Sequence, residues 1–188
     1  NVPDTDENTA DGYGALSTDR LGTRSVAIGA GALFTQDFST ATTTFNTAVG
    51  YNAGNVISTG TRHTLIGYQA GRLLTSSNYN TVVGSGALQS DTLGSFSTAV
   101  GRNALNAQNF TTATNSNNTA IGMNAGEVVS TGINNTFVGS LAGDGTDDGA
   151  GNTAVGSGAL SVNCGDNNTA VGLTSLALAT GGGNTAIG

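Results

Sequence analysis

A short pattern, Asn-Thr-Ala-Val-Gly followed by two variable residues and alanine, recurs along almost the whole chain and limits what the chain can fold into. Eleven copies can be counted, and their final glycines lie 16, 17 or 21 residues apart. A unit of this length holds two short strands and two turns, and it is too short for a helical-hairpin repeat. The sequence therefore predicts an all-β fold, a parallel β-solenoid of about eleven coils over residues 8–188.

A second, longer period lies above the first. Gln36 and Phe38 recur 72 positions later as Gln108 and Phe110, in the two coils that carry a 21-residue spacing. Residues 30–101 and 102–173 thus look like a duplicated block of four coils. Such duplication suits an elongated scaffold, because added coils lengthen it without disturbing a unique core. Residues 1–7, acidic and containing Pro3, are interpreted as an N-terminal linker.

The repeat pattern also predicts how the strands are covered. Side chains alternate across a strand, so Thr47 and Val49 point one way while Asn46 and Ala48 point the other. Both faces look buried, with the valine or isoleucine row in the core and the threonine hydroxyls bonded internally. One thin coil covers only one face, so neighbouring chains are expected to cover the second. Elongated parallel chains close most simply as a homotrimer; a single-chain solenoid and an open-ended filament are the alternatives.

Three rows of repeat residues are expected to stack from coil to coil. Asparagine suits turns, and its amide can bond to the next coil's backbone or side chain. The structural reading of this asparagine row is preferred to ligand binding. The predicted structural ladder comprises Asn46, Asn80, Asn118, Asn135 and Asn152, Val49, Val83, Val100, Val138 and Val155, and Gly50, Gly84, Gly101, Gly122, Gly139 and Gly156.

The charge pattern argues against several classes of partner. Charged residues make up 9% of the chain, the formal net charge is −7, and lysine is absent. Neutralising nucleic-acid phosphates needs a basic stripe, so no nucleic-acid partner is expected. No apolar run approaches the roughly 20 residues that span a bilayer, so this segment is not expected to insert into a membrane.

The sequence carries no pattern of catalytic residues. His63 occupies the asparagine position of its repeat, and Cys164 lies in a polar loop. A catalytic base needs a nucleophile and an orienting acid, and no motif marks either. The chain is therefore expected to be neither an enzyme nor a cofactor-binding protein.

Two local features are candidates for binding. Asp144, Asp147 and Asp148 gather in a glycine-rich loop as a weak calcium candidate, although a solvated turn is favoured and no other metal site is expected. Phe38 and Phe110 lie on the two insertions and are candidate surface contacts for a host-surface protein or glycan. The alternative, which we favour, is that these two rings cap widened coils.

Ice binding is a rival function for a threonine-rich solenoid. That activity needs Thr-x-Thr on one flat face, whereas here the residue two positions after each repeat threonine, except Thr9, is valine or isoleucine. Because that second position is expected in the core, the pattern disfavours an ice-binding face.

The repeats resemble those of a known group of fibre proteins. Ser25 to Gly29 reads SVAIG and Ser97 to Gly101 reads STAVG, similar to the YadA-like head repeats of trimeric autotransporter adhesins. Comparable NTAVGxxAL arrays look like those of phage tail fibres and of surface fibre proteins. The resemblance covers nearly the whole chain and implies a left-handed parallel β-roll in a homotrimer.

The same resemblance implies a place and a role. It suggests a cell-surface adhesin head or a phage fibre shaft, extracellular or on a virion, with further copies of the chain as partners. A host-surface protein or glycan would be the other partner. The alternative is a self-assembling extracellular filament subunit with a purely structural role, and an ice- or glycan-binding solenoid is favoured less.

Overall fold

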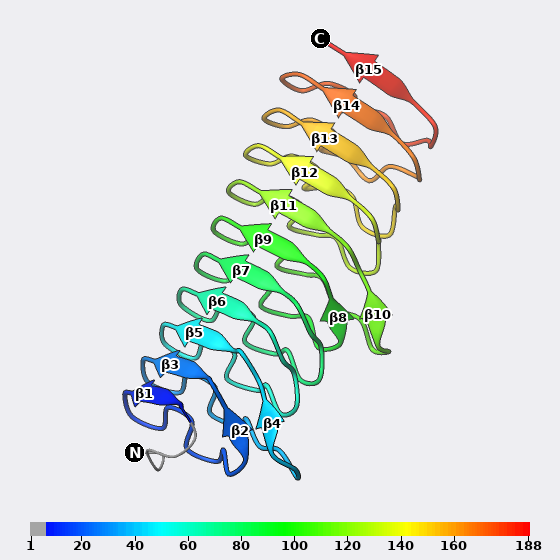
Figure 1. Ribbon diagram of the computed structural model, residues 1–188. Helices are drawn as coiled ribbons and strands as arrows, with labels where there is room; N and C mark the ends of the chain where they lie inside the picture. The colour runs from blue at the N-terminus through cyan, green and yellow to red at the C-terminus, as the bar shows by residue number, and fades with distance from the viewer. Residues whose placement is uncertain (1–6) are drawn as a thin grey trace.

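The computed structural model describes residues 7–188, which contain fifteen short strands and no helix. The predicted all-β, parallel β-solenoid of about eleven coils is confirmed, and Figure 1 shows the coils stacked from the N-terminal to the C-terminal end. Of the predicted linker, only Glu7 is among the described residues. The strands are β1 (Thr9–Asp11), β2 (Gly22–Thr23), β3 (Val26–Ile28), β4 (Thr42–Thr43), β5 (Thr47–Val49), β6 (Thr64–Ile66), β7 (Thr81–Val83), β8 (Gly94–Ser95), β9 (Thr98–Val100), β10 (Thr114–Asn115), β11 (Thr119–Ile121), β12 (Thr136–Val138), β13 (Thr153–Val155), β14 (Thr169–Val171) and β15 (Thr185–Ile187).

One strand from each coil joins a single parallel sheet of eleven strands, β1-β3-β5-β6-β7-β9-β11-β12-β13-β14-β15. Repeat positions pair with their equivalents, as Thr119 with Thr136 and Ile121 with Val138. Because the register follows the repeat, each position of the pattern becomes a straight column along the solenoid axis.

The final glycine of each repeat is required where the strand ends. Gly50 has φ of +139°, a conformation that side chains other than glycine rarely adopt. A Cβ added at Gly50 would also lie 2.7 Å from the carbonyl carbon of Gly67 in the next coil. These glycines therefore stack backbone against backbone, which explains why the repeat keeps them at this position.

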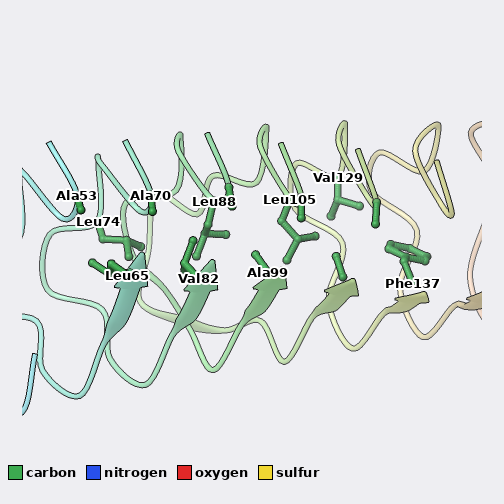
Figure 2. Packing of buried hydrophobic residues seen from close by; sticks show 14 of the residues in the cluster. Ala53, Leu65, Ala70, Leu74, Val82, Leu88, Ala99, Leu105, Val129 and Phe137 are labelled. Atoms are coloured by element: carbon green, nitrogen blue, oxygen red, sulfur yellow. The ribbon is translucent and has the colours of Figure 1, made fainter. Parts of the chain in front are cut away.

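The core is a narrow column inside the coils. In Figure 2, side chains from the sheet, such as Leu65, Val82 and Ala99, point toward side chains from the opposite wall, such as Leu74 and Leu105. The alanines three residues after the final glycines, such as Ala53, also lie in this core. Small residues let the two walls approach closely, so the interior is filled despite the short coil.

Two kinds of coil fill this interior differently. Some carry leucine four residues after the final glycine, as Leu105 does, with polar Gln108 three residues further on. Others carry glycine four residues after the final glycine and an apolar residue three residues further on, as Gly126 and Val129 do. A Cβ at Gly126 would lie 2.8 Å from the Phe137 ring, so the glycine makes room for a large residue on the sheet. Volume lost at one position is thus restored at another.

Each 21-residue coil adds a second short strand. β4 pairs with β2, and β10 pairs with β8, both in parallel. The insertions therefore extend the solenoid wall and hydrogen-bond to the coil before them, as Figure 1 shows for β8 and β10.

Candidate functional surfaces

The asparagine row lies inside the coils. Asn118 is fully buried, and its Oδ1 accepts a hydrogen bond from the backbone N–H of Asn135 at 2.9 Å. Its Nδ2 donates to the carbonyl of Gly132 at 2.7 Å. Asn46, Asn80 and Asn135 form the same two bonds within the described chain. Each asparagine thus joins its own coil to the next one and satisfies buried backbone groups.

One buried amide of the row lacks a partner. Asn152 accepts from the N–H of Asn168 at 2.8 Å, but its Nδ2 has no hydrogen-bond partner among the described residues. The following coil is one residue shorter, and the Gly165 carbonyl there accepts from Asn168 instead. The shorter coil therefore leaves a buried donor unpaired, which costs stability.

His63 takes an asparagine's place in the row. Its Nδ1 accepts from the N–H of Asn80 at 3.2 Å, so Nε2 carries the proton that it donates to the Ser77 carbonyl at 2.9 Å. Burial lowers the pKa of His63 to about 4. A buried, neutral imidazole with both nitrogens bonded to backbone serves as a structural member of the row.

Serine replaces asparagine at two coils, and glutamine fills the space. The Gln108 Nε2 donates to Ser97 Oγ at 3.0 Å, and its Oε1 accepts from Asn118 at 2.8 Å. Gln36 makes the equivalent bonds with Ser25 and Asn46 in the first block. The recurrence of glutamine in both insertions therefore reflects a buried polar network.

That network includes an acidic side chain. Asp91 is fully buried and accepts from Gln108 Nε2 at 2.6 Å and from the N–H groups of Gly94 and Phe110 at 3.1 Å. Burial raises the pKa of Asp91, and these hydrogen bonds oppose the rise. The carboxylate holds the insertion against the preceding coil.

Phe38 and Phe110 do not present a surface for binding. Each is only 6% exposed, and a Cβ added at Gly94 would lie 2.9 Å from the Phe110 ring. The Phe110 ring thus covers a glycine of the preceding coil where the solenoid widens. The burial agrees with the favoured interpretation that these rings cap widened coils and not with surface contacts, because burying a ring against the wall gains more than leaving it in solvent.

The three aspartates of the acidic loop are not gathered around one point. Asp144 is half-buried, Asp147 and Asp148 are exposed, and Asp147 bonds to the hydroxyl of Ser130. Within residues 7–188, no three histidine, cysteine, aspartate or glutamate side chains are placed to hold a metal ion. Burial, and in smaller part the charge of Glu127, raise the pKa of Asp144.

The coil encloses only one face of the eleven-stranded sheet. The asparagine and alanine positions point into the coil, whereas the threonine and valine or isoleucine positions point outward. Ile121 is 41% exposed and Val155 is 37% exposed. Both faces were expected to be covered, one by the coil and one by neighbouring chains. The coil covers the asparagine and alanine face, because alanine and the opposite wall fill its narrow interior.

The threonine row lies on this same outer face. Thr47, Thr64 and their equivalents form no side-chain hydrogen bond within the described residues, so the predicted internal bonding of their hydroxyls was wrong. We call the surface formed by the threonine and valine or isoleucine rows the outer sheet face. It is straight, uncharged from β3 to β15, and periodic at about 4.8 Å per coil.

A second exposed column lies just before the asparagine row. The Arg62 guanidinium carbon lies 5.8 Å from the centre of the Phe45 ring and 5.2 Å from that of Tyr79. Tyr79 and Phe96 stack with ring centres 5.0 Å apart. All four residues have positive φ, although bulky residues avoid that region. The sequence analysis did not predict this column. The signal that could have found it is the arginine or aromatic residue directly before the asparagine position of these repeats.

Comparison with known proteins adds no relative. No protein-family model, curated protein or solved structure matches the chain. Nothing in residues 7–188 has the length and hydropathy of a membrane-spanning helix.

Proposed function

We propose that the chain is a non-catalytic structural and adhesive segment of an exported fibre, and that it works as a parallel homotrimer. The observation that supports this proposal is the outer sheet face. It runs the length of the solenoid, and half of its positions are valine or isoleucine, such as Ile66 and Ile121. Apolar surface of this extent usually marks a protein interface.

Three copies around one axis would cover that face. Each chain contributes a straight wall with the same spacing, so equivalent coils would meet at equivalent heights. The valine and isoleucine side chains would form the shared core, and the threonine methyl groups would pack beside them. This arrangement would leave the turns and the aromatic column outside, where an adhesin or fibre shaft meets its target.

The length of the molecule supports a fibre role. Eleven coils at about 4.8 Å each make a rod of roughly 50 Å, and adding coils extends it without altering the cross-section. A location outside the cell or on a virion follows from the resemblance to adhesin and tail-fibre repeats, and remains part of the proposal.

An end-to-end filament is the second candidate. The parallel eleven-stranded sheet repeats one register from coil to coil, so a coil of a second chain would add to it by the same pairing.

The outward threonine row also revives the ice-binding alternative, because both rows lie on a flat open face. That activity requires the face to stay uncovered, so it excludes the trimer.

Native mass by light scattering over a dilution series tests these candidates. The chain has a mass of 18.4 kDa, and the trimer predicts a stable species of about 55 kDa. Mass that grows with concentration supports the filament and overturns the closed trimer. A monomer also overturns the trimer, and its thermal hysteresis in freezing solution then tests ice binding.

A further inference from the structure

A groove of about 290 Å³ opens on the first three coils of the solenoid. Two of its lining residues, Tyr13 and Tyr51, directly follow the final glycines of their repeats, and Ala30 occupies the same position in the coil between them. Tyr13 is 91% exposed. The small alanine leaves a gap in the column, so the groove lies between two tyrosines.

The Tyr51 wall of the groove is held in place by a neighbouring ring. The rings of Tyr51 and Tyr68 stack with centres 5.6 Å apart and planes inclined by 12°. One face of Tyr51 is thus occupied, which leaves the other toward the gap above Ala30. The Ala30 backbone is held as well, because its carbonyl accepts from the N–H of Asn52 at 2.9 Å. The groove therefore exists before any ligand arrives, which lowers the cost of binding.

The width of the gap favours a ring that is not flat. Tyr13 and Tyr51 are two coils apart, which is on the order of 10 Å along the axis. Carbon atoms in contact lie about 3.5–4.0 Å apart. A flat aromatic ring stacked between two tyrosine rings would therefore span a separation of only about 7–8 Å between them. A puckered saccharide ring is thicker, and it carries C–H groups on both faces that pack against aromatic rings.

Polar groups line the base of the groove. Asn55 Nδ2 donates to the Gly31 carbonyl at 2.9 Å and approaches Asn52 Oδ1 at 3.3 Å. Within the described chain, Asn52 Nδ2 and Asn55 Oδ1 make no hydrogen bond, so a donor and an acceptor remain for a ligand. Amide pairs suit vicinal hydroxyls, and the absence of charge among the lining residues favours a neutral ligand.

Positions 72 residues further along the chain show that the fold does not require this groove. They lie on equivalent strands and turns, but they lack the aromatic walls and carry a long, exposed side chain, Arg102, at the position of Ala30. The counterparts are Ser85 for Tyr13, Arg102 for Ala30, Asn106 for Phe34 and Met123 for Tyr51. The aromatic lining is therefore an addition to the scaffold.

We propose that this groove binds one neutral pyranose unit of a surface glycan, held between Tyr13 and Tyr51 with its hydroxyls at Asn52 and Asn55. The inference rests on the adhesive part of the proposed function and gives it a ligand class. It replaces Phe38 and Phe110 as the predicted place of contact.

Saturation-transfer NMR and calorimetry on the full chain test the proposal, using neutral oligosaccharides of glucose, galactose, mannose and N-acetylglucosamine as probes. At least one should bind with Kd of about 1 mM or lower. Ala30→Arg copies the residue of the second block into the gap and should weaken binding at least tenfold. Ser85→Arg adds the same charge to the same column two coils beyond Tyr51 and should bind like wild type.

Tyr51→Ala should also abolish binding, while Met123→Ala at the equivalent site should not. Failure of every saccharide to bind overturns the proposal, as does undiminished binding by Ala30→Arg. Tighter binding of a planar nucleoside than of any saccharide overturns it too. Native mass measured on the same samples separates the two claims, because a trimer that binds no saccharide overturns the groove and keeps the fibre.

Discussion

The side chain of Asn118 binds the backbone of Asn135 one coil further along the solenoid, with Oδ1 2.9 Å from the amide nitrogen. Its Nδ2 reaches the carbonyl of Gly132 and the side chain of Gln108 at the same time. One fully buried residue thus satisfies three groups, and its two backbone bonds repeat at Asn46, Asn80 and Asn135.

Replacing Asn118 with alanine should therefore cost far more than the lost side chain suggests. The change leaves a buried N–H, a buried carbonyl and the Gln108 oxygen without partners, at about 1–3 kcal/mol for each such group. We expect the free energy of unfolding in urea to fall by at least about 2 kcal/mol. Asn115→Ala, an exposed site in the same coil, should change it by less than about 0.5 kcal/mol. Equal losses of unfolding free energy in the two variants would contradict the stabilising role assigned to the asparagine row.

His63 should make stability depend on pH. Its pKa is lowered from 6.5 to about 4 in the folded chain, so the unfolded chain binds the proton more tightly. The stability that neutral His63 contributes is present above pH 6.5 and is lost as the pH falls toward 4, by about 3 kcal/mol in total. His63→Asn restores the usual residue of the row and should remove this part of the pH dependence.

The measurement is urea unfolding of wild type and His63→Asn at several values between pH 7 and pH 4. Carboxylates such as Asp91 titrate in both proteins, so the difference between the two curves isolates the histidine. Parallel curves would mean that His63 is charged or exposed in the folded state.

Gly126 and Phe137 should behave as a coupled pair. A Cβ at Gly126 meets the Phe137 ring at 2.8 Å, so Gly126→Leu alone should overpack the core and cost about 1–3 kcal/mol. Phe137→Ala alone should leave a cavity and cost about 3–5 kcal/mol. The double variant recreates the combination found at Leu105 and Ala120, with leucine in the same positive-φ position.

The double variant should therefore be more stable than the sum of the two losses predicts. A coupling of about 0.5–3 kcal/mol in a double-mutant cycle is the expected result. Strict additivity would show that the two positions do not share one volume inside the coil.

Val155 tests the outer sheet face without disturbing the coil. Its side chain is 37% exposed and points away from the interior, so Val155→Asp can hydrate its charge within a single chain. We expect the circular dichroism spectrum of the folded chain and a native mass that drops from trimer to monomer, because burying unpaired carboxylates at the shared axis is costly.

Ser157→Asp, an exposed site two residues further in the adjoining turn, is the matched control and should leave the mass unchanged. If both variants assemble like wild type, the outer sheet face is not the trimer interface. If Val155→Asp fails to fold, the valine row contributes to the coil itself, contrary to the observed orientation.

Much of the fold could be predicted from the repeat, because spacing and β-branched residues bear on local backbone geometry directly. The number of coils, the parallel pairing and the stacked glycines such as Gly50 all follow from strict recurrence. The interior position of His63 could also be anticipated, since it replaces an asparagine in an otherwise regular row.

The candidate binding surfaces were harder to predict. Phe38 and Phe110 lie on polar insertions, which commonly carry exposed aromatics, yet both rings pack against the preceding coil. The groove between Tyr13 and Tyr51 depends on residues 38 positions apart with Ala30 between them, and only the stacking of three coils brings them together. The orientation of the valine row depended on which face the opposite wall occupies.

The sequence by itself determined that the chain is a parallel solenoid with one coil per repeat, because a regular pattern of glycine, asparagine and β-branched residues permits that backbone in every coil. Only the tertiary structure decided which side of each strand is the inside. Alternation along a strand separates two sets of side chains but does not say which set is enclosed. The turn after the glycine brings the alanine and leucine wall over Asn46 and Ala48, and this packing leaves Thr47 and Val49 facing outward.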